Sequence, residues 1–140
     1  MQIVRRISAL AFTGALLLGA ACGDDDNPTA PTFASVAGNY RATRFTATSG
    51  SLSQDILQTG GSLTATFNAN GTLTGHATVP TQGLNEDFTG QWKLVNGKVE
   101  IEQVPTDIFV EDVDFAIVGN TLVGDETFSG VRVQVTLTKQ

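Results

Sequence analysis

The feature that most constrains the fold is a regular alternation of apolar and polar residues. Between residues 62 and 67, and again between 72 and 79, apolar residues or glycine occupy every second position and mostly threonine occupies the others. A period of two places each set of side chains on one face of a strand, which predicts half-buried β structure. Asn70-Gly71 lies between the two runs and tolerates the positive φ angles of a tight hairpin turn.

The same pattern continues to the end of the chain, and helix signals are nearly absent. Asn96-Gly97, Gly119-Asn120 and Ser129-Gly130 mark further turns. About eight short strands in sequential hairpins predict an all-β fold. Such a meander closes most simply by pairing its last strand with its first, which also removes exposed edges. We therefore expect an antiparallel, up-and-down β-barrel; a β-sandwich is the alternative, although it usually needs longer crossovers.

The alternation breaks near the start of the domain. Tyr40 and Ala42 share one face, but Phe45 is out of phase with them, which predicts a bulge near Arg44. Residues 47–61 form the one long connection. A short helical turn is expected over residues 51–58, with Leu52, Ile56 and Leu57 facing inward. Long ordered connections in small domains are often binding loops, and an ordinary surface loop is the other interpretation.

The first 21 residues have the pattern of a cleaved signal peptide. Arg5 and Arg6 precede an apolar run from 7 to 18, and the small residues Gly19-Ala20-Ala21 follow it. The apolar run is shorter than the roughly 20 residues that a transmembrane helix needs. Cys22, the only cysteine of the chain, comes directly afterwards.

Residues 19–22 resemble the lipobox of bacterial lipoproteins, in which the cysteine is acylated and becomes the first residue of the mature chain. Gly19 stands where that pattern prefers an aliphatic residue, and Leu18 lies one position further out. The resemblance implies that Cys22 carries several acyl chains, palmitate among them, which would hold the protein in membrane lipid. It implies a bacterial cell-envelope location, at the outer membrane or cell surface, with a periplasmic-facing position also open. The alternative is a plain secretory signal that leaves Cys22 a free thiol.

The sequence divides into three parts. Residues 1–21 are the expected signal peptide, residues 22–35 the lipidated cysteine with a flexible tether, and residues 36–140 the β-barrel domain. The tether follows from the three like charges of Asp24-Asp25-Asp26, which repel one another, and from the Pro- and Thr-containing stretch after them.

The net charge limits the kinds of partner, and the cysteine content limits how the domain can be stabilised. The chain has 14 acidic and 8 basic residues, and removing residues 1–21 takes away two arginines and no acid, so the net charge falls from −6 to −8. Such an acidic chain argues against nucleic acid as a partner. With no cysteine pair, the domain of about 105 residues must be stabilised by one packed core. The oligomeric state stays open.

No set of residues has the spacing of a catalytic site, so we expect a protein that is not an enzyme. His76 is the only histidine and falls on the threonine face, which should be the outer one. Without a second imidazole or a thiol in the domain, no transition metal or other cofactor is predicted. The acidic residues near the ends of neighbouring strands match no calcium-binding loop and are interpreted as a solvated surface: Glu111, Asp112, Asp114, Asp125 and Glu126.

The segment Val36-Ala37-Gly38-Asn39-Tyr40 resembles the Gly-x-Trp opening of lipocalin-like proteins, with Tyr40 in place of the tryptophan. The resemblance covers residues 36–140 and implies a cup for small hydrophobic molecules. In that family the aromatic residue packs across the closed end of the barrel against an arginine of the last strand. Arg132 is the nearest match by position, although the alternation places it outside.

The small residues expected on the inner face leave room for an apolar ligand, or else relieve strain where strands bend. We therefore expect the protein to bind or carry a small hydrophobic molecule; the alternative is a non-catalytic structural or protein-interaction module of the envelope. An inward Arg44 would receive a ligand carboxylate, with Glu126 as the other inner charge. The residues expected to bind the ligand are Phe67, Trp92, Phe115, Tyr40 and Arg44.

Overall fold

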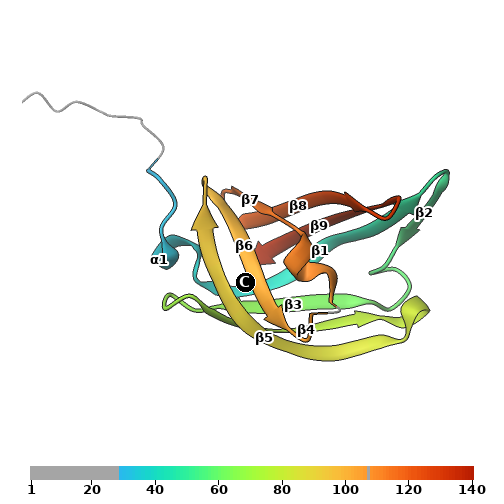
Figure 1. The fold of residues 1–140 in the computed structure, drawn as a ribbon, viewed down its shortest axis with the longest axis horizontal. Coiled ribbons are helices and arrows are strands. Elements are labelled where there is room, and N and C mark those ends of the chain that lie inside the picture. Colours follow the sequence, from blue (N-terminus) through green and yellow to red (C-terminus); the bar gives the residue numbers. More distant parts are fainter. Residues whose placement is uncertain (1–28, 107) are drawn as a thin grey trace, which may run out of the picture.

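The computed structural model describes residues 29–106 and 108–140, so the signal peptide, Cys22 and the aspartates after it lie outside the described residues. The described part is mostly β structure. In chain order the elements are α1 (Phe33–Val36), β1 (Gly38–Ser49), β2 (Leu52–Asp55), β3 (Ser62–Phe67), β4 (Thr72–Val79), the 3-10 helix η1 (Pro80–Gln82), β5 (Leu84–Val95), β6 (Lys98–Val104), the 3-10 helix η2 (Phe109–Asp112), β7 (Phe115–Val118), β8 (Thr121–Phe128) and β9 (Val131–Lys139) (Figure 1).

Eight of the strands close into an antiparallel barrel, which confirms the expected fold class. β1 pairs with β3, each later strand pairs with the next in sequence, and β9 returns to pair with β1. This last pairing extends from Tyr40 opposite Lys139 to Ser49 opposite Val131. β2 is an additional strand that extends the sheet beside the end of β1. The strands and the buried core of the barrel lie within residues 29–140, so this part of the chain holds a complete fold.

The alternating residues form one contiguous core, and the barrel interior is filled. A Cβ built on Gly75 would collide with the ring of Phe88, and one on Gly124 would collide with Val113. The inward glycines therefore make room for neighbouring side chains, which pack with the other buried residues into one core. The largest fully buried side chains are Phe45, Phe67, Phe88, Phe115, Leu63, Leu73, Ile108, Leu122 and Leu137.

The predicted bulge near Arg44 is present. The register of β1 against β9 shifts between Ala42 and Arg44, so Ala42 and Phe45 both face inward although they are three residues apart. The helical turn expected over residues 51–58 is wrong in its first part, because residues 52–55 form β2. A hydrogen-bonded turn follows over residues 56–60, where the Gly60 amide donates to the Leu57 carbonyl at 3.2 Å. β1 continues beyond the barrel rim and turns at Gly50, which has a φ of 58°, into β2. Leu52 at this turn is 77% exposed, so the hairpin projects into solvent.

The helix α1 closes one end of the barrel. Thr32 caps it, because its Oγ1 accepts from the Ser35 amide at 3.1 Å. The Phe33 ring lies against the indole of Trp92, with the ring centroids 4.5 Å apart. Beneath them the Phe67 ring makes edge-on contacts with both Tyr40 and Trp92. These four aromatic rings form what we call the closed end.

The cation at the closed end differs from the one that the family resemblance suggested. Lys139 places its Nζ 6.0 Å from the centroid of the Tyr40 ring and donates to the Ser35 carbonyl at 3.1 Å. Arg132 lies on the outer face instead and forms an ion pair with Asp125. The reason is position along β9, because Lys139 is opposite Tyr40 whereas Arg132 is opposite Thr48, toward the other end of β1.

Replacing Gly90 by alanine should destabilise the barrel by about 3 kcal/mol. A Cβ at this position would run into the backbone of β6, at the Glu102 carbonyl, and backbone cannot move aside as a side chain can. Urea denaturation of Gly90→Ala measures the loss. Thr89→Ala, at the neighbouring exposed position, is the control and should change stability by less than about 0.5 kcal/mol. Equal stability of the two variants would contradict the close approach of β5 and β6.

Tyr40→Phe should cost about 1–2 kcal/mol while leaving the fold intact. The Tyr40 hydroxyl donates to the Val36 carbonyl at 2.7 Å, and burial raises the pKa of this phenol. The variant keeps the ring contacts but leaves the carbonyl of the buried Val36 without that donor. Relative to the unmodified protein, hydrogen exchange of the variant should become faster in α1 than in β9. Unchanged protection of α1 would argue against a stabilising role of this hydrogen bond.

Candidate ligand-binding cup

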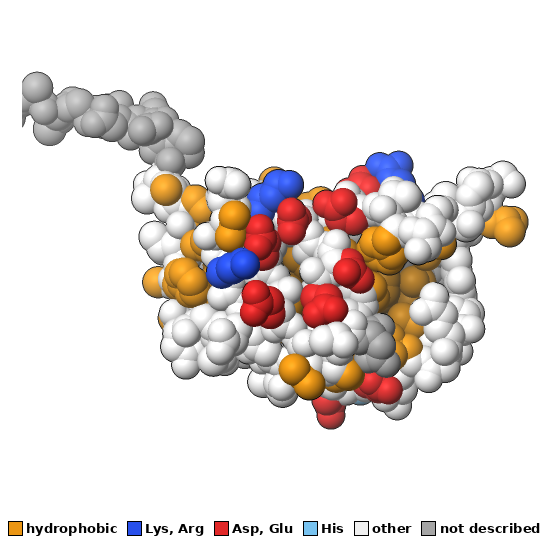
Figure 2. Space-filling model, viewed as in Figure 1, with side chains coloured by type: hydrophobic (Ala, Val, Ile, Leu, Met, Phe, Trp, Pro, Cys, Tyr) orange, Lys and Arg blue, Asp and Glu red, His pale blue; other side chains and the backbone are white. Residues whose placement is uncertain are grey.

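An apolar hollow of about 200 Å³ lies at the end of the barrel opposite α1. It is formed where β1 and β4 end, where β8 turns into β9, and where η2 crosses the barrel. We call this hollow the cup; in Figure 2 apolar side chains are visible in a recess on the side away from the closed end. Its lining consists of eight apolar residues and two polar ones: Phe45, Ala47, Ile56, Val79, Phe109, Phe128, Val131, Val133, Gln82 and Ser129.

The segment between β6 and β7 supplies one wall of the cup. These two strands share only two register pairs, Lys98 with Ala116 and Val99 with Phe115, so their other ends separate. The connecting segment fills the gap and brings the Phe109 ring to 5.1 Å from that of Phe45. Gln103, which is 3% exposed, holds this segment through its Nε2, which donates to the Ile108 carbonyl and, at 3.3 Å, to the Pro105 carbonyl.

The residues expected to bind the ligand lie elsewhere. Phe67, Trp92 and Tyr40 belong to the closed end, and Phe115 is fully buried in the core, so none of the four lines the cup. Arg44 is exposed on the outer face, where its Nη2 donates to Gln134 at 2.7 Å. The inward orientation considered for Arg44 is therefore wrong, because the bulge turns Phe45 inward in its place.

The alternation contained part of the signal that identifies the cup. It places Val131 and Val133 on the inner face, and the break in phase at Phe45 marks this residue as inward. Sequence reasoning missed Phe109, which comes from a connection rather than a strand. It placed Ile56 inward but did not assign this residue to the site. The sequence also did not show which end of the barrel stays open, because this depends on where the connections lie in space.

The charged side chains near the cup lie on both faces of the barrel wall. On the outer face, the Asp125 carboxylate accepts from Arg132 at 2.7 and 2.5 Å and from Gln134 at 2.8 Å. The hydrogen bonds from Arg132, followed by the one from Gln134, lower the pKa of Asp125 to about 2. On the inner face Glu126 is half-buried opposite Val133, as the alternation predicted.

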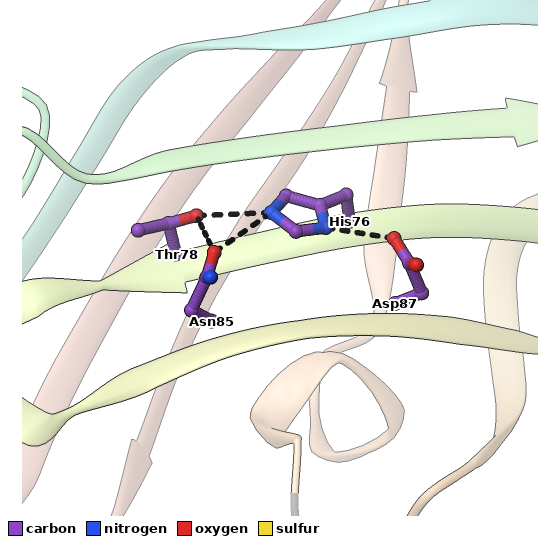
Figure 3. A network of polar contacts seen from close by, with 4 residues as sticks. All are labelled: His76, Thr78, Asn85 and Asp87. Carbon is purple, nitrogen blue, oxygen red and sulfur yellow. Dashed lines mark hydrogen bonds and ion pairs between the residues drawn. The ribbon is translucent and has the colours of Figure 1, made fainter.

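His76 lies on the outer face, as expected, within a polar network that joins β4 and β5 (Figure 3). Its Nδ1 is 2.7 Å from Asp87 Oδ1, and its Nε2 is 3.1 Å from both Thr78 Oγ1 and Asn85 Oδ1. The Thr78 hydroxyl itself donates to Asn85 at 3.1 Å. His76 stands opposite Asp87 and Thr78 opposite Asn85 on the paired strands, so these cross-strand contacts stabilise the pairing.

Within residues 29–106 and 108–140, no group of three or more His, Cys, Asp or Glu side chains could hold a metal ion. In the same part of the chain, no helix has the length and apolar character needed to cross a bilayer. Comparison with protein-family models, with curated proteins and with solved structures gives no match.

The Asp125 network should make a small, pH-dependent contribution to stability. Because the folded pKa of about 2 lies below the usual value for aspartate, the contribution is present above about pH 4 and is lost as the pH falls through 2. Asp125→Asn should therefore lower Tm by less than about 5 °C at pH 6, since the pair is exposed. Thermal denaturation from pH 6 to pH 2 should show this difference disappear, and a constant difference would contradict the assignment.

Proposed function

We propose that this protein is a lipid-anchored lipoprotein of the bacterial cell envelope whose barrel binds or carries a small hydrophobic molecule. The observation that supports ligand binding is the cup, an apolar recess at the rim of an otherwise filled barrel. Burial of apolar ligand surface against such a lining is favourable by roughly 25 cal/mol per Å². The closed eight-stranded antiparallel barrel is also the architecture that the lipocalin-like resemblance implies.

The anchor proposal rests on the signal-like pattern of residues 1–21 and on Cys22 after it. The described chain leads into the barrel through α1, at the closed end (Figure 1). A chain held at Cys22 therefore enters the domain on the side opposite the cup. Residues 23–32 lie between Cys22 and α1, and ten residues of extended chain span at most about 35 Å. The tether would therefore hold the domain near the bilayer with the cup directed away from it.

A non-catalytic interaction module is the second candidate, and one observation favours it. The hairpin of β1 and β2 projects from the barrel and presents Leu52, which is 77% exposed, at its turn (Figure 1). A short strand with a free edge and an apolar tip can pair with another chain. In that case Leu52→Ser would abolish binding of a partner without affecting the cup.

Ligand binding should be measurable with an apolar fluorescent probe and a soluble form of the chain that begins at Asn27, because this form keeps the whole barrel. We expect saturable binding at one site. Ala47→Trp should weaken it at least tenfold by filling the cup, whereas Thr48→Trp, the next residue and not part of the lining, should leave it within about twofold. Failure of the unmodified chain to saturate would count against a carrier.

The anchor has an independent test. Intact-mass measurement of the protein from the membrane fraction should show a chain that begins at Cys22 and carries the added mass of its acyl groups. Cys22→Ser should lose that mass and leave the membrane fraction. A mature chain with an unmodified Cys22 would overturn the proposed location but would leave the ligand-binding proposal untouched.

A further inference from the structure

We propose that the cup selects a neutral or cationic ligand about the size of one ring, and discriminates against carboxylates of the same size. Glu126 is the residue that we infer sets this preference. The inference rests on the proposed ligand-binding function and specifies the chemical class of ligand. Four features of the molecule support it: the volume of the cup, its lining, the position of every described basic residue, and the acidic residues beside the mouth.

The volume limits what can be enclosed. Sites for drug-sized ligands usually have about 300–1,000 Å³, whereas an apolar cavity of about 150 Å³ is enough for benzene. The cup has about 200 Å³. Phe45 and Val79 are buried at its floor, and the barrel beyond them is filled with packed side chains. A long acyl chain therefore cannot extend deeper into the barrel, and one ring with a short substituent is the size that fits.

The two polar residues of the lining are suited to an uncharged polar substituent. Gln82 ends η1, and Ser129 lies in the turn between β8 and β9 with a φ of 52°. Both are exposed, so they belong to the mouth rather than the floor. An amide and a hydroxyl can each donate and accept a hydrogen bond, which suits a ligand hydroxyl or amine that remains near water.

No described basic side chain reaches the cup. Arg44 and Arg132 stand on the outer face of the wall, where they are bound to Gln134 and Asp125. Lys139 is at the closed end, and the other three are exposed: Arg41, Lys93 and Lys98. A carboxylate that entered the cup would lose hydration without gaining a cationic partner, and this is costly in an apolar site.

Acidic residues, in contrast, lie near residues that line the cup, on β8 and on η2. Glu126 is half-buried on the inner face, opposite Val133 and two residues before Phe128, both of which line the cup. Among the described residues its carboxylate has no ion-pair partner. Glu111 and Asp112 belong to η2, the turn that contributes Phe109. Figure 2 shows acidic side chains beside the recess. The resulting negative potential repels anions and attracts cations.

Three compounds that share one ring test the preference: benzylamine, benzyl alcohol and benzoate, titrated at pH 7 by calorimetry into the soluble form that begins at Asn27. We expect benzylamine and benzyl alcohol to bind and benzoate to bind at least tenfold more weakly than benzylamine. Added salt should reduce this ratio, because screening weakens the interaction with the acidic mouth. Ala47→Trp should abolish binding of all three and so locate it in the cup.

Glu126→Gln identifies the residue responsible. This variant should reduce the ratio of benzylamine to benzoate affinity at least threefold and leave benzyl alcohol unchanged. Glu102→Gln is the matched control, because Glu102 faces outward beside Lys93, and should leave the ratio unchanged.

Equal affinity for the three compounds, or tightest binding of benzoate, would overturn the inference while leaving the proposed function in place. An unchanged ratio in Glu126→Gln would overturn the role of this residue. Absence of saturable binding for every compound, while the fluorescent probe still binds, would overturn this inference alone. Absence of binding for the probe as well would overturn the ligand-binding function.

Discussion

The pairing of β9 with β1 is the interaction on which the rest of the structure depends. It converts a row of hairpins into a closed barrel, so that the alternate residues of every strand face a common interior. Closure also pairs the edges of β1 and β9 that would otherwise template association, whereas β2 keeps a free edge. The bulge at Ala42 and Arg44 lets one long strand keep this pairing along its whole length. Its consequence is a change of phase, which turns Phe45 into the interior and Arg44 out to solvent.

Closure gives the barrel two ends with different physical properties. At one end, α1 and four aromatic rings seal the core, and Lys139 covers the Tyr40 ring. At the other end, side chains from β1, β4, β8, β9 and four connections surround an apolar recess. The barrel wall also separates side chains of opposite charge. The described Arg and Lys side chains lie outside it, whereas Glu126 faces inward near the mouth of the cup. These two asymmetries underlie the binding site that we propose at the rim of the barrel.

Much of this architecture was predictable from residue order. The two-residue period identified the strands and their inner faces, and the Asn-Gly and Ser-Gly pairs marked the turns that the structure contains. The out-of-phase Phe45 indicated the bulge. The expected binding residues Phe67, Trp92 and Phe115 are inward, as the alternation predicted. Phe67 packs against Trp92 and Phe115 is fully buried, so none of the three lines the cup.

The sequence by itself determined the fold class, since alternation and turn chemistry are local properties that each hairpin expresses without reference to the others. It also determined the excess of acid and the single cysteine ahead of the domain. Only the tertiary structure decided which inward residues fill the core and which surround free space. That outcome depends on how the connections before β3 and before β7 cross the barrel, and on how glycines such as Gly90 admit a neighbouring backbone. These are contacts between residues distant in the chain, and no local pattern encodes them.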